Sequence, residues 1–157
     1  MSLAYVVKRL GLRPRDLRRR SVRYRLQSVV FFVQQFCCFD YDFPLHIRGP
    51  YSPRLAGDLK LISRLGEKEL DLLASQVEAE KAAVIEGVLS AVAGERGAVL
   101  EVAATLFELL RVYRGDAEGA VSHLKWIKPW VSDWHVDRAV SLLKRLGLYA
   151  EAQSALG

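Results

Sequence analysis

Apolar residues recur at helical spacing along almost the whole chain of 157 residues. The clearest case is segment 98–113, in which one face carries Val99, Val102, Leu106, Leu109 and Leu110. Segment 17–39 is apolar on several sides, which is typical of a helix in the middle of a bundle. The spacing predicts a mainly α protein, a single-domain bundle of seven or eight helices over residues 1–157. At most it adds a short β segment near Tyr41 to Arg48, where Pro44 favours an edge strand or an extended arm.

Capping residues set the boundaries of these helices. Ser52, Asp116 and Ser132 stand where an N-cap is needed, and glycines at 11, 66 and 147 suit helix ends. The predicted helices cover residues 3–10, 17–39, 53–65, 67–77, 78–93, 98–113, 116–127 and 132–146. The segment 78–93 is either a separate helix or a continuation of the one before it.

The stretch from His46 to Asp58 is the part of the chain most tightly specified by backbone geometry. Gly49 can adopt positive φ, Pro50 fixes its own φ, and Ser52 with Pro53 forms an N-cap followed by a proline at the first helical position. These residues predict a corner at which an extended segment turns into a helix. Ser52 is fully explained as a cap, so we do not expect it to act as a nucleophile.

Composition limits the class of protein. A hydrophobic fraction of 51% and a charged fraction of 26% exclude intrinsic disorder. The longest relevant apolar run, 29–33, is far too short to span a bilayer, and the basic N-terminus lacks the apolar core of a signal peptide. We therefore expect a cytoplasmic protein that does not contact a membrane. An excess of arginine over lysine and the absence of asparagine fit a thermophile, although a GC-rich genome gives the same arginine bias.

No spacing of cysteine, histidine or carboxylate indicates a metal site or another cofactor. The only cysteines, Cys37 and Cys38, are adjacent, and neighbouring cysteines do not pair easily. We expect both to be unpaired thiols in or near the core.

Basic residues are concentrated at the N-terminus. Residues 1–25 contain nine lysines and arginines and one acid, which is a net charge of +8 in a chain whose total is +5. Such a segment can bind nucleic acid, with these candidate contacts: Arg15, Arg18, Arg19, Arg20 and Arg23. The alternative, which we favour, is a solvated helix face that pairs with acids elsewhere in the fold.

A few other residues are candidates for recognition. Arg48 and Tyr51 flank the corner, and Lys128 and Trp130 lie in a tryptophan-rich turn between two predicted helices. A purely structural role is the alternative for each, such as Arg48 paired with Asp40, Asp58 or Glu101. The two helices around this turn have a helix-turn-helix outline, but a β wing does not follow them.

Several of these positions together resemble the YwgA-like family of uncharacterised prokaryotic proteins. The matching positions are Arg23, Gln27, Tyr41 to Phe43, Ile47 to Ser52, Leu55, Leu100 to Leu106 and Lys128 to Pro129. That family is in turn distantly similar to the SocA-like antitoxins with a Panacea domain, which share a glutamine in the first core helix and a Gly-Pro turn. The resemblance implies a mostly helical domain that neutralises a toxin or delivers it to a protease, and it supplies no catalytic residues. This chain has Ser28 where a lysine is expected.

Our leading hypothesis is a non-enzymatic protein-interaction domain, either antitoxin-like or a proteolysis adaptor. Its binding surface would comprise Gln27, Arg48, Gly49, Pro50, Tyr51, Ser52, Lys128 and Trp130. The partner is a protein of unknown identity, with a second copy of the chain as one alternative. Nucleic-acid binding through the basic N-terminus is the second hypothesis, and an enzyme of unrecognised type is the third.

Overall fold

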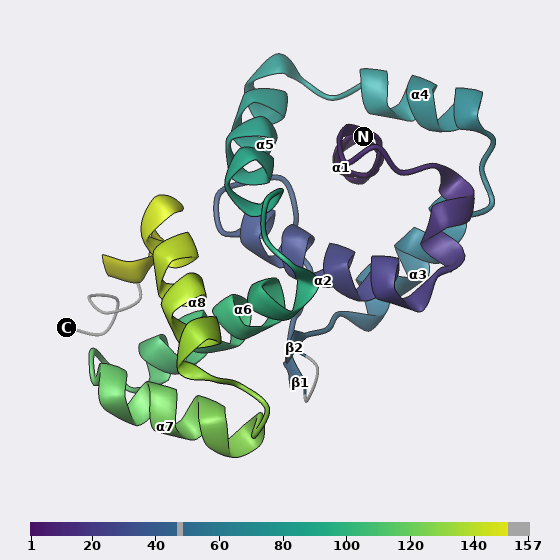
Figure 1. Ribbon diagram of the computed structural model, residues 1–157. Helices are drawn as coiled ribbons and strands as arrows, with labels where there is room; N and C mark the ends of the chain where they lie inside the picture. The colour runs from purple at the N-terminus through teal and green to yellow at the C-terminus, as the bar shows by residue number, and fades with distance from the viewer. Residues whose placement is uncertain (47–48, 151–157) are drawn as a thin grey trace.

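The computed structural model describes residues 1–46 and 49–150, and within them the chain is a mainly α single-domain bundle (Figure 1). The described residues form eight α-helices, one 3-10 helix and two short strands. In chain order these are α1 (Ser2–Arg9), η1 (Pro14–Arg18), α2 (Arg20–Gln34), β1 (Leu45–His46), β2 (Gly49–Pro50), α3 (Pro53–Ile62), α4 (Glu67–Ser75), α5 (Ala79–Val92), α6 (Gly97–Val112), α7 (Ala117–Ile127) and α8 (Asp133–Arg145). The predicted fold class is confirmed.

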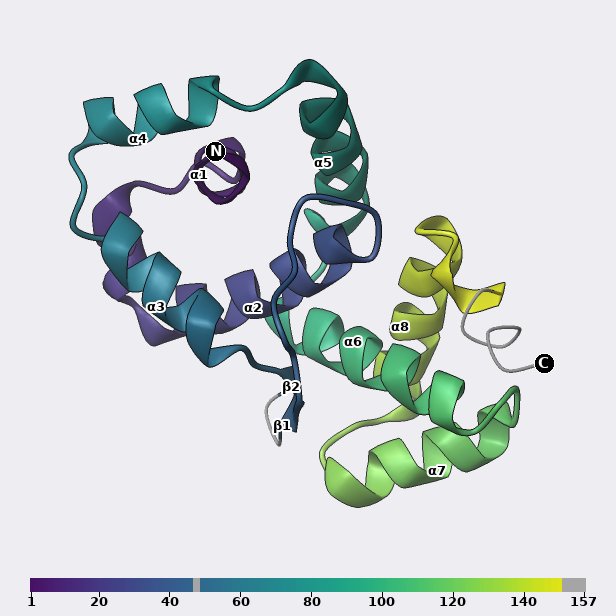
Figure 2. The same ribbon diagram turned by 180° about the vertical axis from the view of Figure 1, so that it is seen from behind.

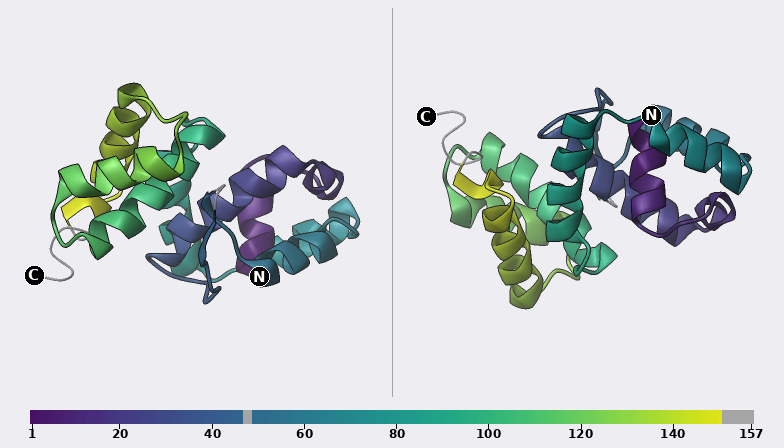
Figure 3. Two further views of the ribbon diagram at one scale, coloured as in Figure 1. Left: turned by 90° about the horizontal axis from the view of Figure 1, so that it is seen from below. Right: turned by 90° about the horizontal axis from the view of Figure 1, so that it is seen from above.

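Helices α2 and α6 form the centre of the bundle. Every residue of α2 from Leu26 to Val33 is buried, and α6 buries most of its length. Helix α2 packs against α6, while α7 and α8 both pack on α6 (Figures 1 and 2). Views from below and above show the α6–α8 group on one side of the molecule and α1–α4 on the other (Figure 3). A ligand that contacts both α2 and α6 therefore binds at the junction of the two groups.

The predicted caps are confirmed. The Ser52 hydroxyl accepts a hydrogen bond from the Leu55 amide at 3.1 Å, and an Asp116 carboxylate oxygen accepts one from the Gly119 amide at 2.9 Å. Ser132 caps α8 in the same way. Each cap satisfies an amide that has no partner inside its helix.

One predicted helix has the wrong boundaries, and the structure decides between the two alternatives for segment 78–93. The segment 17–39 contains the end of η1, then α2, then a turn, because Arg19 is extended (φ −80°, ψ 129°) and Cys38 has φ 80°. The segment 78–93 does not continue α4, because Glu78 is extended (φ −66°, ψ 145°) and α5 begins after it. None of the three breaks, at Arg19, Cys38 and Glu78, falls at a glycine or proline, so the sequence carries no strong signal for them.

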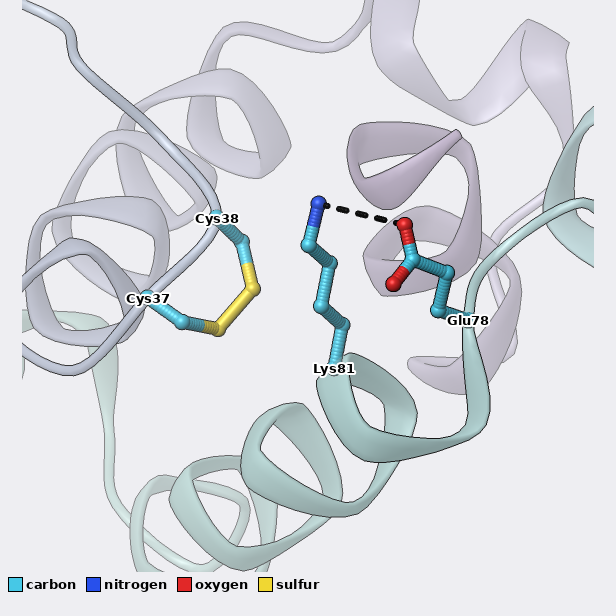
Figure 4. Close-up of a disulfide and its surroundings, with 4 residues drawn as sticks. All are labelled: Cys37, Cys38, Glu78 and Lys81. Carbon is cyan, nitrogen blue, oxygen red and sulfur yellow. Dashed lines mark ion pairs between the residues drawn. A yellow bond between two sulfur atoms is a disulfide. The ribbon is translucent and has the colours of Figure 1, made fainter.

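The turn after α2 also corrects the prediction for the cysteines. Cys37 and Cys38 are joined by a disulfide (Figure 4). The positive φ at Cys38 belongs to this tight turn, and the two sulfur atoms meet across it. Lys81 lies opposite the disulfide and forms an ion pair with Glu78 at 3.8 Å (Figure 4).

Two glutamines of α2 hold the segment that leads to the corner. The Gln34 side-chain amide pairs with both backbone polar atoms of Tyr41, each at 2.8 Å. The Gln27 amide does the same for Ser52, at 3.0 Å to its carbonyl oxygen and 2.8 Å from its amide nitrogen. We call residues 41–52 the arm. Between its two attachments the arm folds back on itself, with Leu45 opposite Pro50 and His46 opposite Gly49 in antiparallel register.

Side chains from α2 and α8 contact the turn between α5 and α6 at Glu95. The guanidinium groups of Arg138 and Arg145 in α8 lie 2.9 and 3.1 Å from Oε1 of Glu95, whose side chain is 4% exposed. Arg25 of α2 donates a hydrogen bond to the Glu95 carbonyl oxygen at 2.7 Å.

No helix among the described residues is long and apolar enough to cross a membrane.

Candidate binding site

The corner that the sequence predicts is present and lies directly against α6. Gly49 has φ 98°, a conformation that L side chains rarely adopt. A Cβ atom on Gly49 would lie 2.7 Å from Cγ of Glu101. The residue must be glycine for two independent reasons, the backbone angle and the close approach of α6.

Most of the predicted surface residues support the corner from beneath. Gln27 is 2% exposed and Ser52 is 1% exposed, and Gly49 and Pro50 are also buried. These residues cannot contact a partner without rearrangement, so the structure places them as supports of the site and leaves Tyr51 as the half-buried residue of the corner. Arg48 lies outside the described residues.

Lys128 corrects our expectation of an accessible cation. Its side chain is 1% exposed, and its Nζ lies 3.4 Å from Oε2 of Glu101. Burial lowers the pKa of Lys128, and the neighbouring Glu101 carboxylate opposes this shift. Glu101 thus touches both Gly49 and Lys128, and it joins the predicted corner to the turn between α7 and α8.

Two hollows open on the surface around this support. The smaller has a volume of about 190 Å³ and is lined by Arg20, Arg23, Tyr24, Gln27, Tyr51 and Ala56. The larger has a volume of about 520 Å³ and is lined by Ser21, Tyr24, Arg25, Ser28, Gly97, Ala98, Glu101 and Trp130. Tyr24 separates the two hollows, and its ring centroid lies 6.4 Å from that of Tyr51. Trp130 is 47% exposed and forms part of the larger hollow's wall.

The basic N-terminal segment behaves in two ways. Two of its cations pair with acids elsewhere in the fold, as the favoured alternative predicts: Lys8 with Asp71 at 3.1 Å, and Arg9 with Glu86. Two more are engaged within the segment, where Arg19 pairs with Asp16 at 3.0 Å and Arg23 donates to backbone carbonyl groups. Others are exposed and form no ion pair with a described residue: Arg15, Arg18 and Arg20. A cationic surface therefore remains beside the smaller hollow.

Sequence reasoning missed the residues that connect the site. Tyr24, Arg25 and Ser28 belong to the surface that faces the two hollows, and Glu101 links the corner to Lys128. The only signal for the first three is their position on α2, within one turn of Gln27. In the sequence Tyr24 stands between Arg23 and Arg25, and the fold adds a second aromatic ring, Tyr51, next to Tyr24 and the arginines of α2.

The described part of the chain contains no cluster of three or more histidine, cysteine or carboxylate side chains that could hold a metal ion. No protein-family model, curated protein or solved structure matches the chain. The resemblance to the YwgA-like family stays a prediction.

Proposed function

We propose that the chain is a protein-interaction domain, and that its partner presents an acidic segment to the smaller of the two hollows beside α2. The observation that carries the proposal is the smaller hollow, in which Tyr24 and Tyr51 stand beside Arg20 and Arg23. Tyrosine and arginine are the residue types that contribute most to binding at interfaces.

The support beneath Tyr51 favours a binding role. Gln27 holds both backbone polar atoms of Ser52, and Gly49 is packed against Glu101. A corner held in this way loses little conformational entropy when a partner binds, which increases affinity. The proposal accounts for the burial of four predicted site residues, because they hold Tyr51 in position.

Charge indicates the chemistry of the partner. Arg20 is exposed, lines the smaller hollow and forms no ion pair with a residue that the structure describes. Residues 1–25, which include Arg20, carry a net charge of +8, against +5 for the whole chain. Complementary charge accelerates association and selects the partner, so an acidic segment is the chemistry that we expect. A toxin or a substrate presented to a protease is the class of partner that the YwgA-like resemblance implies.

The test uses a purified partner. Proteins captured by the wild-type chain from its native host are purified individually and measured by calorimetry against four forms of the chain. We expect Tyr51→Ala and Arg20→Glu to weaken binding at least about tenfold, as for interface hot spots. Leu72→Ala is the matched control, because Leu72 is 62% exposed on α4, away from the site. A partner that binds all four forms equally would rule out this surface, and sedimentation of the chain alone identifies self-association.

One observation favours nucleic acid as a second candidate. The fold places aromatic rings among the arginines, as in proteins that bind single strands by stacking and backbone contacts. Binding through about six phosphates would lose about a thousandfold in affinity between roughly 50 and 200 mM salt. Arg18→Ala would reduce the slope of log affinity against log salt by about 1. Failure of labelled single-stranded RNA and DNA to bind at low salt would remove this candidate.

A further inference from the structure

The larger hollow differs from the smaller one in its chemistry. Helix α6 begins at its edge, with Gly97 and Ala98 in the lining, and α2 contributes Ser28 and Arg25. Its volume of about 520 Å³ falls within the range of small-molecule sites. This hollow faces the α6 side of Tyr24, so its ligand does not depend on the partner surface proposed above.

The first turn of α6 presents uncapped amides. The N-cap residue Arg96 makes no side-chain hydrogen bond to the helix, and no described group accepts a hydrogen bond from the amides of Gly97 or Ala98. The helix is 16 residues long, and its aligned peptide dipoles give its N-terminus a partial positive charge. Such a terminus binds anions through its amides.

A second, independent feature of the hollow is the Ser28 hydroxyl group. Ser28 is 3% exposed, and its hydroxyl forms no hydrogen bond within the described part of the chain. Every completely enclosed side-chain nitrogen or oxygen in that part has a partner. The Ser28 hydroxyl must therefore be open to the hollow that the residue lines. A nearly buried hydroxyl without a protein partner is expected to serve a ligand or an ordered water.

Arg25 adds a positive charge at the same end. Its guanidinium group donates to the carbonyl oxygens of Glu95 and Ala93 at 2.7 and 3.4 Å, which uses two of its five donors. Among the described residues of the lining Glu101 is the only acid, and Lys128 balances its charge. The end of the hollow near Gly97 is therefore rich in donors and positively charged.

The walls of the hollow are aromatic. Tyr24 forms one side, and Trp130 forms another with its ring edge-on to His135 at 5.2 Å between centroids. We propose that this hollow binds a nucleoside monophosphate, with its phosphate at the amides of Gly97 and Ala98 and its base against Trp130. Two amides, a hydroxyl and a guanidinium exceed the two oxygens of a carboxylate and suit the three free oxygens of a phosphate.

The test measures binding of adenosine 5′-monophosphate to the full chain by calorimetry. Gly97→Pro removes one amide donor. The backbone accepts it, because Arg96 has φ −69° and ψ 154° and proline is favoured at the first helical position. Gly97→Ala keeps the amide and adds a methyl group in open space, so it is the matched control. We expect Gly97→Pro and Ser28→Ala to weaken binding at least about tenfold, the effect of losing one hydrogen bond to a charged group. Gly97→Ala should bind within about twofold of wild type.

Two further measurements complete the test. Adenosine and inorganic phosphate, used separately, should each bind more weakly than the monophosphate. The nucleotide should quench tryptophan fluorescence in Trp134→Phe but not in Trp130→Phe, two positions of similar exposure at 50% and 47%. The proposal is overturned if the wild-type chain does not bind the monophosphate, if adenosine binds equally well, or if Ser28→Ala retains full affinity. If Gly97→Pro fails to fold, Ser28→Ala decides the result.

Discussion

Gly49 and Glu101 are so close that a single added methyl group on the glycine would overlap the glutamate side chain, with 2.7 Å between Cβ and Cγ. At Gly49 the backbone of the arm packs directly against the Glu101 side chain of α6. A side chain at position 49 should therefore lower the stability of the fold and displace Tyr51 together.

Gly49→Ala should lower the free energy of unfolding by about 1–3 kcal/mol, because it combines positive-φ strain with the overlap against Glu101. Gly94→Ala is the control, since a Cβ atom there meets open space and its φ is not positive. Denaturant unfolding of both variants provides the comparison. Equal midpoints would contradict the close contact between the arm and α6.

Gln27→Ala should destabilise the fold by about 2–4 kcal/mol, because it leaves the amide of buried Ser52 without a partner and removes one of the two hydrogen bonds to its carbonyl oxygen. The other, from the Ala56 amide at 3.0 Å, remains. Gln34→Ala removes the same pair of hydrogen bonds from Tyr41, but at a partly buried site that water can reach. We expect its cost to be about 1 kcal/mol. The two variants would be compared by urea unfolding, and an equal loss would show that burial does not set the cost.

The stability of the protein should rise with pH below 10.5, the ordinary pKa of lysine, because burial lowers the pKa of Lys128 in the folded state. Between the folded pKa and 10.5 the unfolded chain binds more protons, so raising the pH favours folding. Glu101→Gln removes the opposing charge, lowers the pKa of Lys128 further and should start this rise at a lower pH. Urea unfolding from about pH 7 upward measures the effect.

Lys128→Met is the control for this experiment, because it removes the titrating group and keeps an unbranched side chain that is shorter by a single heavy atom. Above pH 8 the rise should be absent in Lys128→Met. Below pH 8 the N-terminal amino group, whose pKa burial lowers from 8.0, contributes a rise in every variant. Burial raises the pKa of Tyr41, so Tyr41 lowers the stability of the protein as the pH rises above 10. This fall is the same in every variant. A rise that persists in Lys128→Met must come from another group.

The chain should react as a protein without free thiols, because Cys37 and Cys38 are joined. Alkylation followed by mass spectrometry should modify neither residue before reduction and both after it. Reduction should change the melting temperature little, because a crosslink between adjacent residues closes almost no loop. Alkylation of the untreated chain at both cysteines would contradict the disulfide.

Local features were predictable from the sequence. The caps at Ser52, Asp116 and Ser132 and the glycine at the corner depend on a few neighbouring residues, and each is confirmed. The helical spacing was sufficient for the fold class because helices leave a regular apolar pattern.

Features that depend on distant residues were not predictable. The burial of Lys128 requires Glu101 to approach from another helix, and the donors of the larger hollow come from α2 and α6, about 70 residues apart in sequence. No local pattern marks Ser28 as the residue that meets the start of α6. The binding roles of these residues remain predictions for the experiments above.

The cluster at Glu95 constrains how this protein can evolve. Arg138 and Arg145 meet on one carboxylate oxygen, so loss of Glu95 would leave two guanidinium groups without their counter-ion. Arg25 contacts only carbonyl oxygens at this turn, and these are present whichever side chain occupies position 95. Among related sequences, Glu95 and the two arginines of α8 should therefore covary, while residue 25 should vary independently of position 95.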